Sequence, residues 1–408
     1  FFNVMVVNGV SWPELEVAPA LYRFRMLNGS NSRFINVSLQ RVRGGGQKKN
    51  SQRGAELPFY QIGAEQSLLP QVVEIRTGKA TPLAGDGIPL GDDDERTNAP
   101  YSQQALLLGP AERADVIVDF RGLKDGDVIR MINTAPDAPF GGFPDVPADP
   151  ATTGQVMQFR VNYAHNGLSP TDPAGDTPAT DPWAIQLSLP EALVDGKPNP
   201  ALGPAIDCAI PDSNCRDLAL LEEESTKVCA TVNPTGAVIF DGNAIPDGLG
   251  NCVELEAGLP TTVIAASVPF GPQAAVLGTE GSSGPNAQLW SEQIKQMPKL
   301  GETETWEMWN HSADAHPMHM HLVKFKVVDR QDFELDAAGV PALSGGPILP
   351  AAGEAGWKDT VIAYPGQVTR VNATFDIPGL YVWHCHIVEH EDNEMMVPFC
   401  VEDGSGAE

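Results

Sequence analysis

Hydrophobic and polar positions alternate along much of the chain, a pattern that predicts β-strands rather than helices. Segment 22–39, "YRFRMLNGSNSRFINVSL", alternates, turns at Asn and Ser residues and alternates again. Segment 304–328 follows the same order, from "ETWEMW" through an Asn and Ser turn to "HLVKFKVV". A further strand, turn and strand occur later in each half, at 111–133 and 356–375. This internal repeat predicts two copies of one β-sandwich.

Composition changes along the chain predict where the two copies meet. We expect residues 1–163 to form the first sandwich, which closes with "VMQFRVN". Residues 164–215 include "HNGLSPTDPAGDTPATDPW", whose prolines, aspartates and glycines are typical of a linker. Residues 216–408 would form the second sandwich. The Gly-rich basic run at 41–54 lacks the Lys-Ser/Thr ending and the strand-to-helix context of a phosphate loop, so we interpret it as an insertion between strands.

The overall composition limits the partners that the chain can have. The 40 glycines and 36 prolines favour a turn-rich β protein. Fifty-three acidic residues against 26 basic ones give a net charge of -27, which repels nucleic acid and anionic membranes, so we expect neither as a partner. No window approaches the ~18 apolar residues of a membrane helix. The first residues, "FFNVMVVNGV", contain no initiator methionine and resemble the edge of a strand, so we expect further sequence upstream.

Six cysteines indicate the compartment. Four of them lie in a Pro-, Gly- and Asp-rich region where disulfides would staple loops, although spacing alone leaves their pairing open: Cys208, Cys215, Cys229 and Cys252. Such disulfides would require an oxidising environment, so we expect an extracellular, periplasmic, or cell- or spore-surface location. Cys400, in the apolar "MMVPFCV", is expected to be a small buried hydrophobic residue.

Histidines are concentrated near the C-terminal end. Seven of the eight lie between positions 311 and 390, and six of these belong to the motifs "HPMHMH" (316–321) and "HCHIVEH" (384–390). Side chains alternate between the two faces of a strand, so Cys385 points one way while His384 and His386 point the other. By the same parity His319 and His321 share a face, and His316 can turn to the opposite side. The sequence therefore predicts two separate metal sites along one strand.

On the side of Cys385, His316 and His390 complete a set of two imidazoles and one thiolate, to which Met395 can add a weak axial thioether. This donor set is typical of a blue-copper electron-transfer site. Zinc is the main alternative, but its structural sites prefer closed tetrahedral sets of Cys and His and seldom use methionine. Met396 is a second candidate for the axial position.

On the other face, four imidazoles come together without a protein anion: His319, His321, His384 and His386. Imidazoles without thiolates suit copper ions that bind and reduce a small molecule such as dioxygen. Electrons arriving at Cys385 would need to cross only the adjacent backbone to reach this face.

The two histidine motifs together resemble the third domain of multicopper oxidases, and the match is close to the bacterial spore-coat type of laccase. Five further segments resemble the second and third domains of that group: "VNGVSWPELEVAPALYRFRMLNGSNSRFINVSL", "GAEQSLLP", "LGPAERADVIVDF", "QVMQFRV" and "GWKDTVIAYPGQV". The resemblance implies an all-β chain of two cupredoxin-like Greek-key β-sandwich domains joined by a Pro/Asp-rich linker. It also implies copper as the cofactor, with the first sandwich free of copper.

Carried over residue by residue, the resemblance implies that His316, Cys385, His390 and Met395 bind type 1 copper, that His319 binds type 2 copper, and that His321, His384 and His386 bind the type 3 pair. Glu391 matches an acid that laccases of this type use to deliver protons to oxygen; an ordinary exposed carboxylate is the alternative interpretation. His311 matches no role.

The resemblance implies a laccase-like oxidase, which takes single electrons from phenols, aromatic amines or metal ions at type 1 copper and reduces dioxygen to water. The family's copper cluster needs four further histidines from an N-terminal domain, but before position 311 this chain has only His165. We therefore expect a missing N-terminal cupredoxin domain as a partner, besides a small-molecule electron donor and O2. A standalone cupredoxin-type electron carrier with only type 1 copper is the alternative. A copper nitrite reductase also has two cupredoxin domains, but it normally lacks the His-Cys-His arrangement.

Overall fold

The fold was analysed in a computed structural model of the chain. The residues that it describes are 2–42, 56–77, 105–143, 145–165, 208, 213–223, 227–232, 238–240, 244–246, 251–256, 259–266, 268–269, 274–337 and 339–403. Most of the expected linker, at 166–207, and most of the basic run, at 43–54, lie outside these residues. Within the described part, no helix is long and apolar enough to cross a membrane.

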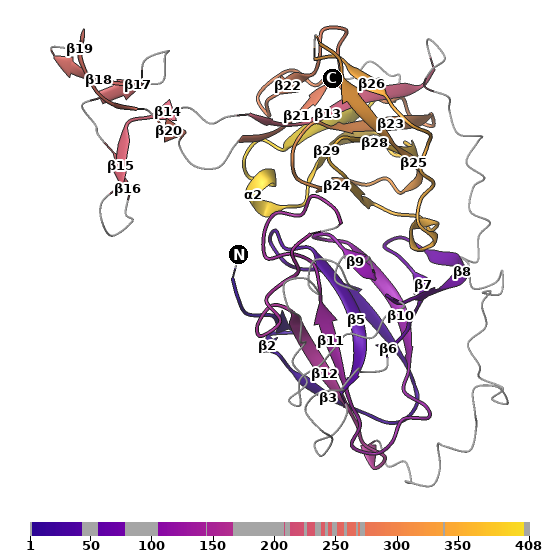
Figure 1. Cartoon of the computed structure of the whole chain (residues 1–408). Coiled ribbons are helices and arrows are strands. Elements are labelled where there is room, and N and C mark those ends of the chain that lie inside the picture. The colour runs from indigo at the N-terminus through magenta and orange to yellow at the C-terminus, as the bar shows by residue number, and fades with distance from the viewer. Residues whose placement is uncertain are drawn as a thin grey trace.

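The first sandwich packs one sheet against another, shown in indigo to magenta in Figure 1. In the described ranges, one sheet has the strand order β4–β10–β7–β8 and the other the order β3–β12–β11–β5–β6, with β9 paired to β5. A short hairpin of β1 and β2 precedes them. The strands are β1 (Val6–Val7), β2 (Val10–Ser11), β3 (Glu14–Val17), β4 (Leu21–Leu27), β5 (Ile35–Val42), β6 (Glu56–Leu57), β7 (Phe59–Gly63), β8 (Leu68–Ile75), β9 (Leu106–Leu108), β10 (Arg113–Asp119), β11 (Val128–Asn133) and β12 (Gln155–Val161).

The second sandwich carries both histidine motifs in its smaller sheet. Among the described strands, the larger sheet has the order β22–β21–β13–β23–β28–β25–β26 and the smaller one the order β27–β24–β29–β30. Their bounds are β13 (Cys215–Glu223), β21 (Ala274–Thr279), β22 (Asn286–Gln288), β23 (Thr303–Asn310), β24 (His316–Met320), β25 (Phe325–Leu335), β26 (Pro341–Leu343), β27 (Thr360–Ala363), β28 (Gln367–Thr374), β29 (Gly379–Cys385) and β30 (Met396–Val401). The two short helices described here are η4 (Ala352–Glu354) and α2 (Val388–Glu391).

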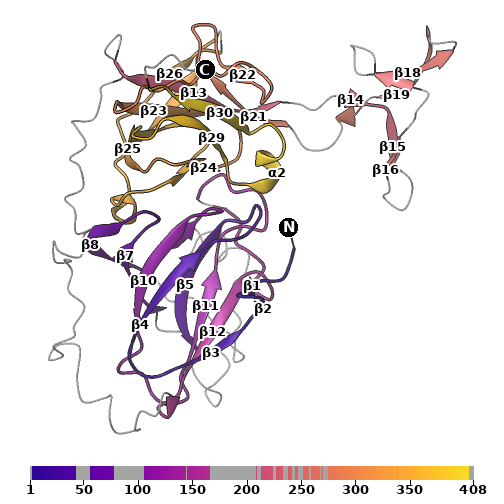
Figure 2. The same ribbon diagram turned by 180° about the vertical axis from the view of Figure 1, so that it is seen from behind.

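Between β13 and β21 the chain leaves the second sandwich and forms three small sheets. Figures 1 and 2 show them projecting away from both sandwiches. Their strands are β14 (Lys227–Val228), β15 (Ala230–Val232), β16 (Val238–Phe240), β17 (Ala244–Pro246), β18 (Asn251–Glu256), β19 (Leu259–Ala266) and β20 (Val268–Pro269). Disulfides join Cys229 to Cys252 in this excursion and Cys208 to Cys215 before it. The internal repeat in the sequence did not predict this excursion.

Alternation of buried and exposed side chains explains why these segments form packed strands. In β10, for example, Ala114, Val116 and Val118 are buried between partly exposed neighbours. The core of the second sandwich also takes in residues of the first, among them Phe34, Leu107 and Phe140, so the two sandwiches pack directly on one another. The prediction of an all-β chain is confirmed. Cys400, which we expected to be buried, is only half-buried because it lies on β30 near its end.

Candidate metal centres

Strands β24 and β29 place the two histidine motifs side by side. They pair in antiparallel fashion, with Met318 opposite Cys385 and His319 opposite His384. Residues directly opposite each other in such a pair project from the same face of the sheet. His319 and His384 therefore share one face, while Cys385 lies on the other, as the alternation in the sequence predicted. Beyond β29, the short helix α2 turns the chain back and carries His390 toward Cys385.

Three side chains, which we call the thiolate cluster, meet on the cysteine side: His316, Cys385 and His390. The Cys385 Sγ lies 3.6 Å from His316 Nδ1 and 3.9 Å from His390 Nδ1, and the two Nδ1 atoms are 3.2 Å apart. A metal with bonds of about 2.0 Å to nitrogen and about 2.3 Å to sulfur would separate trigonally placed ligand atoms by roughly 3.5–3.7 Å, close to the observed distances. The cluster therefore has the size of a metal-binding triangle.

The protonation of the thiolate cluster suits a cation. Burial raises the pKa of the Cys385 thiol, and it lowers the pKa of His316 to about 3, with His390 acting in the same direction. Ser312 Oγ lies 2.6 Å from His316 Nε2 and donates to Asn310 Oδ1, so it accepts the Nε2 proton. The Nδ1 atom of His316 is thus left with a free lone pair. Two neutral imidazoles and a thiol that needs a metal ion to ionise fit the donor set of trigonal copper.

Two methionines follow α2, and the backbone distinguishes them. Met395 is fully buried, its N–H donates to the His390 carbonyl at 3.0 Å, and its carbonyl accepts from the Cys385 N–H at 3.0 Å. Met396 lies opposite His384 on β30 and is half-buried. Met395 is therefore the methionine whose backbone adjoins two members of the thiolate cluster, which favours it over Met396 as an axial ligand.

On the opposite face, four imidazoles form what we call the histidine cluster: His319, His321, His384 and His386. The ligand nitrogens of the first three lie within 4.8 Å of one another, and the Nε2 atoms of His321 and His384 are 3.2 Å apart. The ring of His386 packs with its centroid 5.4 Å from that of His384 and 5.9 Å from that of His319. The structure thus brings all four predicted side chains together, with His386 farther from the centre.

His319 and His384 are neutral and oriented, and the histidine cluster is open to solvent. Burial lowers the pKa of His319 and of His384 to about 4, so both imidazoles are uncharged near neutral pH. The Nδ1–H of His384 donates to the Cys385 carbonyl at 2.9 Å, which directs Nε2 away from the strand. His321 is exposed, and a hollow of about 490 Å³ opens beside His319. Neutral imidazoles with free nitrogens in a solvent-accessible place suit copper ions that must meet a small molecule.

Comparison with known proteins identifies the family. The sequence model described as "Multicopper oxidase" matches residues 267–405, which include both clusters. The chain is 29% identical over 405 residues to a laccase of Bacillus subtilis (strain 168), covering 98% of this chain and 55% of that protein. It is also 29% identical over 403 residues to a laccase of Haloferax volcanii, covering 98% and 47%. Residues 267–405 belong to the multicopper oxidase family. Copper is the cofactor of this family, and the donor sets of both clusters fit it.

Solved multicopper oxidases share the fold. The 2F4 variant of McoA from Aquifex aeolicus superimposes with a TM-score of 0.50 at 23% identity, covering 98% of this chain and 59% of that one. A multi-copper oxidase from Pediococcus acidilactici gives a TM-score of 0.50 at 19% identity, covering 96% and 51%. These likenesses concern the fold alone. The chain spans about half the length of the curated laccases that it matches.

Glu391 and His311 are the two other residues that the sequence singled out, and only Glu391 lies near a cluster. Glu391, at the end of α2, places Oε2 3.6 Å from His384 Nδ1 while its side chain stays partly exposed. This position adjoins the histidine cluster from the solvent side. His311 instead forms a buried pair with Glu280, at 2.5 Å, and packs on Phe333. His311 therefore belongs to neither cluster.

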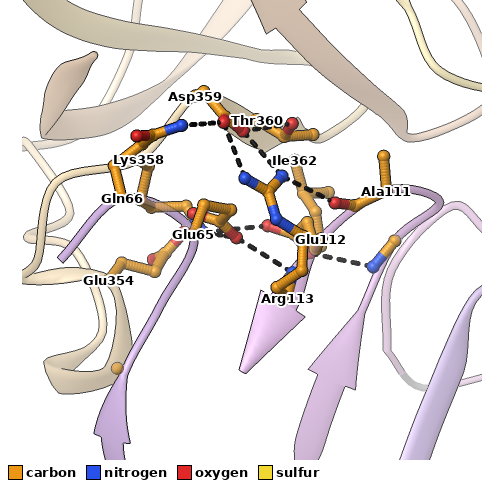
Figure 3. A network of polar contacts seen from close by, with 12 residues as sticks. Glu65, Gln66, Ala111, Glu112, Arg113, Glu354, Lys358, Asp359, Thr360 and Ile362 are labelled. Atoms are coloured by element: carbon orange, nitrogen blue, oxygen red, sulfur yellow. Dashed lines mark hydrogen bonds and ion pairs between the residues drawn. The ribbon is translucent and has the colours of Figure 1, made fainter. Parts of the chain in front are cut away.

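The residues that the sequence did not single out lie where the two sandwiches meet behind His319. Six polar side chains form this sandwich-interface network: Glu65, Gln66, Glu112, Arg113, Lys358 and Asp359 (Figure 3). They belong to the segments "GAEQSLLP", "LGPAERADVIVDF" and "GWKDTVIAYPGQV", which carry the family resemblance. A signal was present, since in each segment two adjacent polar residues interrupt an otherwise apolar strand edge, but nothing in the sequence showed that they pair.

Proposed function

We propose that this chain provides the electron-entry site and half of the dioxygen site of a laccase-like multicopper oxidase. The whole enzyme would take single electrons from a small-molecule donor and reduce O2 to water. One observation carries the proposal: Cys385 of the thiolate cluster is covalently bonded to His384 and His386 of the histidine cluster. The two clusters are therefore joined through two peptide linkages across a single strand.

In this proposal His316, Cys385, His390 and Met395 hold type 1 copper. His319 holds type 2 copper, and His321, His384 and His386 hold the type 3 pair. Copper bound by these residues would supply one-electron redox chemistry and the binding of O2. The triangle of donor atoms around Cys385 and the backbone contacts of Met395 support the first set. The convergence of imidazole nitrogens at His319, His321 and His384 supports the second.

The chain's own residues explain how electrons and protons would reach the two sites. His316 and Cys385 are fully buried, whereas His390 is half-buried, so an electron donor would approach the thiolate cluster at His390. Phenols, aromatic amines or metal ions are the donor classes that we propose. Glu391 stands between solvent and His384, so its carboxylate is placed to carry protons toward the histidine cluster.

The histidine cluster implies a partner that supplies further ligands. Four imidazoles are too few for three copper ions, each of which needs about three or four donors. We propose that an N-terminal cupredoxin domain provides the remaining histidines. The open hollow beside His319 supports this proposal, because a face that is to receive another domain must be accessible.

The location that we propose is outside the cytoplasm: extracellular, periplasmic, or on the cell or spore surface. Two disulfides support it, Cys208–Cys215 and Cys229–Cys252, since such bonds persist in oxidising compartments.

A standalone electron carrier with type 1 copper alone is the less favoured function, because it leaves the convergence of the histidine cluster without a role. The two proposals are distinguished by oxygen uptake with a phenolic donor after the copper-loaded chain is combined with the N-terminal domain of a related laccase. The laccase-like proposal predicts uptake that is lost when His384 and His386 are both replaced by Gln. Uptake that stays at the level of the chain alone, with the added domain bound and copper present, would contradict it.

A further inference from the structure

Three pairs of consecutive residues interlock where the first sandwich meets the second (Figure 3). The second sandwich contributes Lys358 and Asp359, which have opposite charges. Lys358 Nζ donates to Glu65 Oε1 at 2.8 Å and to Glu112 Oε1 at 3.1 Å. Asp359 receives two hydrogen bonds from the Arg113 guanidinium, at 2.8 and 2.7 Å, and one from Gln66. Each pair of neighbours from the first sandwich, 65–66 and 112–113, thus contacts both residues of the second.

This interlock is buried, so it specifies one docking geometry. The side chains of Lys358, Glu65 and Asp359 are 5%, 0% and 8% exposed. A buried charge without its partner is strongly destabilising, so the two sandwiches can meet only in the arrangement that pairs these groups. The bidentate fork of Arg113 adds a fixed orientation to the Asp359 carboxylate, because both guanidinium nitrogens must align with its two oxygens.

The interlock continues directly into the histidine cluster. The Nδ1–H of His319 donates to the Asp359 carbonyl at 2.7 Å and lies 3.1 Å from Thr360 Oγ1. The Thr360 hydroxyl donates to Asp359 Oδ1 at 3.0 Å, so its lone pairs face His319. Two acceptors at Nδ1 hold the proton on that nitrogen. The Nε2 atom of His319 therefore keeps the free lone pair that a metal needs.

Arg113 governs this chain of hydrogen bonds from the other sandwich. If its fork were absent, Gln66 would remain as the donor that holds the Asp359 carboxylate, which could then turn away from Thr360. The Thr360 hydroxyl would then lose its acceptor and could donate to His319 Nδ1 instead. Because the Asp359 carbonyl would still accept at Nδ1, the two contacts would compete, and part of the population would carry the imidazole proton on Nε2, which blocks the nitrogen that faces the cluster.

We propose that Arg113 is a positioning residue for His319, by which the copper-free first sandwich fixes the orientation and tautomer of a copper ligand in the second. The inference rests on the proposed function, in which His319 holds copper. It gives the first sandwich a part in the metal site although it contributes no ligand.

The test compares Arg113→Gln and Arg113→Lys with a matched control in the full 408-residue chain. Arg216→Gln is the control, because Arg216 makes an equally bidentate pair with Glu304 but lies within the second sandwich, away from His319. The exposed fractions are also similar, 31% for Arg113 and 23% for Arg216, with carboxylate partners at 8% and 6%. Two-bond ¹H–¹⁵N spectra of the metal-free chain report the tautomer of each histidine, with the His319 signals assigned by His319→Gln.

The wild-type chain and Arg216→Gln should show His319 with its proton on Nδ1. Arg113→Gln should show a mixture with the Nε2–H tautomer, and Arg113→Lys, which keeps the charge without the fork, a smaller share of it. Titration with copper(II) should show about 10-fold weaker binding at the histidine cluster of Arg113→Gln, with an unchanged thiolate absorption band.

An unchanged His319 tautomer and unchanged copper binding in Arg113→Gln would overturn the inference. So would equal disturbance of the signals of both clusters in Arg113→Gln and Arg216→Gln, because that pattern reports general destabilisation. If Arg113→Gln does not fold, Arg113→Lys decides by the same criteria. A chain that binds no copper at either cluster contradicts the proposed function instead, and the tautomer measurement, which needs no metal, still decides the role of Arg113.

Discussion

The two faces of strand β29 carry clusters of very different character. The thiolate cluster is closed: His316 and Cys385 are fully buried, and the donors of one metal-binding triangle come from this chain. The histidine cluster is open: His321 is exposed, and a hollow lies beside His319. The contrast teaches that one strand can carry a closed cluster on one side and an open cluster on the other, because alternate side chains have independent surroundings.

The largest effect is expected from a substitution that disrupts the thiolate cluster alone. Cys385→Ser removes the only thiolate donor of the thiolate cluster, so the intense visible absorption of a copper thiolate should disappear completely, while copper binding by the histidine cluster persists. Visible absorption spectroscopy of the copper-loaded chain measures this. Cys400→Ser is the matched control, since Cys400 is the other free cysteine and belongs to neither cluster. A visible band that survives Cys385→Ser would show that the thiolate cluster is not a copper site.

The next largest effect is expected from a substitution that disrupts the histidine cluster alone. His321→Gln removes an exposed imidazole of the histidine cluster, so copper affinity on that face should fall by about 10–100-fold, whereas the visible band of the thiolate cluster should stay. Competition with a copper chelator measures the affinity. His165→Gln, at a histidine remote in sequence from both motifs, serves as the control and should change neither site. Equal weakening of both sites by His321→Gln would mean that the two faces are not independent.

The contribution of the sandwich-interface network to folding stability should depend on pH. Burial raises the pKa of Glu65 to about 7, although Lys358 opposes the shift. The folded chain therefore binds more protons than the unfolded chain between about pH 4.5 and 7. The stability linked to this proton is present below pH 4.5 and lost as the pH rises through 7, a change on the order of 3 kcal/mol.

Urea unfolding at pH 5 and 7.5 measures this effect, and Glu65→Gln should abolish the difference that Glu65 makes. Glu354 is the control: burial opposes its ionisation, but Arg330 outweighs this and lowers the pKa of Glu354 to about 2. Its contribution is lost only as the pH falls toward 2, so Glu354→Gln should lower stability equally at pH 5 and 7.5. The same pH dependence in Glu65→Gln as in the wild type would exclude Glu65 as its source.

The smallest expected effect concerns how the closed site is oriented. Ser312→Ala removes the acceptor of the His316 Nε2 proton inside a buried region. It should cost about 1 kcal/mol of folding stability and shift the position of the visible band, because His316 gains freedom to turn. Ser291→Ala, at an exposed serine, is the control for the loss of a hydroxyl. A band position and copper affinity identical to the wild type would show that Ser312 does not orient His316.

Much of the site could be predicted because strand alternation is local. The parity of His384, Cys385 and His386 follows from their positions in sequence, and the structure places them on opposite faces as expected. Helix α2 could not be predicted from the sequence, since a four-residue helix has too few positions to leave a periodic signal.

Long-range pairings could not be predicted from one sequence. Arg113 and Asp359 are separated by 246 positions, and a charged residue at a strand end has the same pattern whether it faces solvent or a partner. The pairing of the cysteines could not be predicted for a similar reason. Four cysteines allow three pairings, and spacing does not favour the observed pairs, Cys208–Cys215 and Cys229–Cys252, over the other two pairings.

The most direct test of the contrast between a finished and an unfinished site is the amount of copper bound per chain after anaerobic reconstitution, measured together with the visible spectrum. The account predicts about one tightly bound copper ion per chain with the absorption band of a copper thiolate. A value of about four copper ions per chain, with no other domain present, would contradict it, because the histidine cluster would then be complete without a partner.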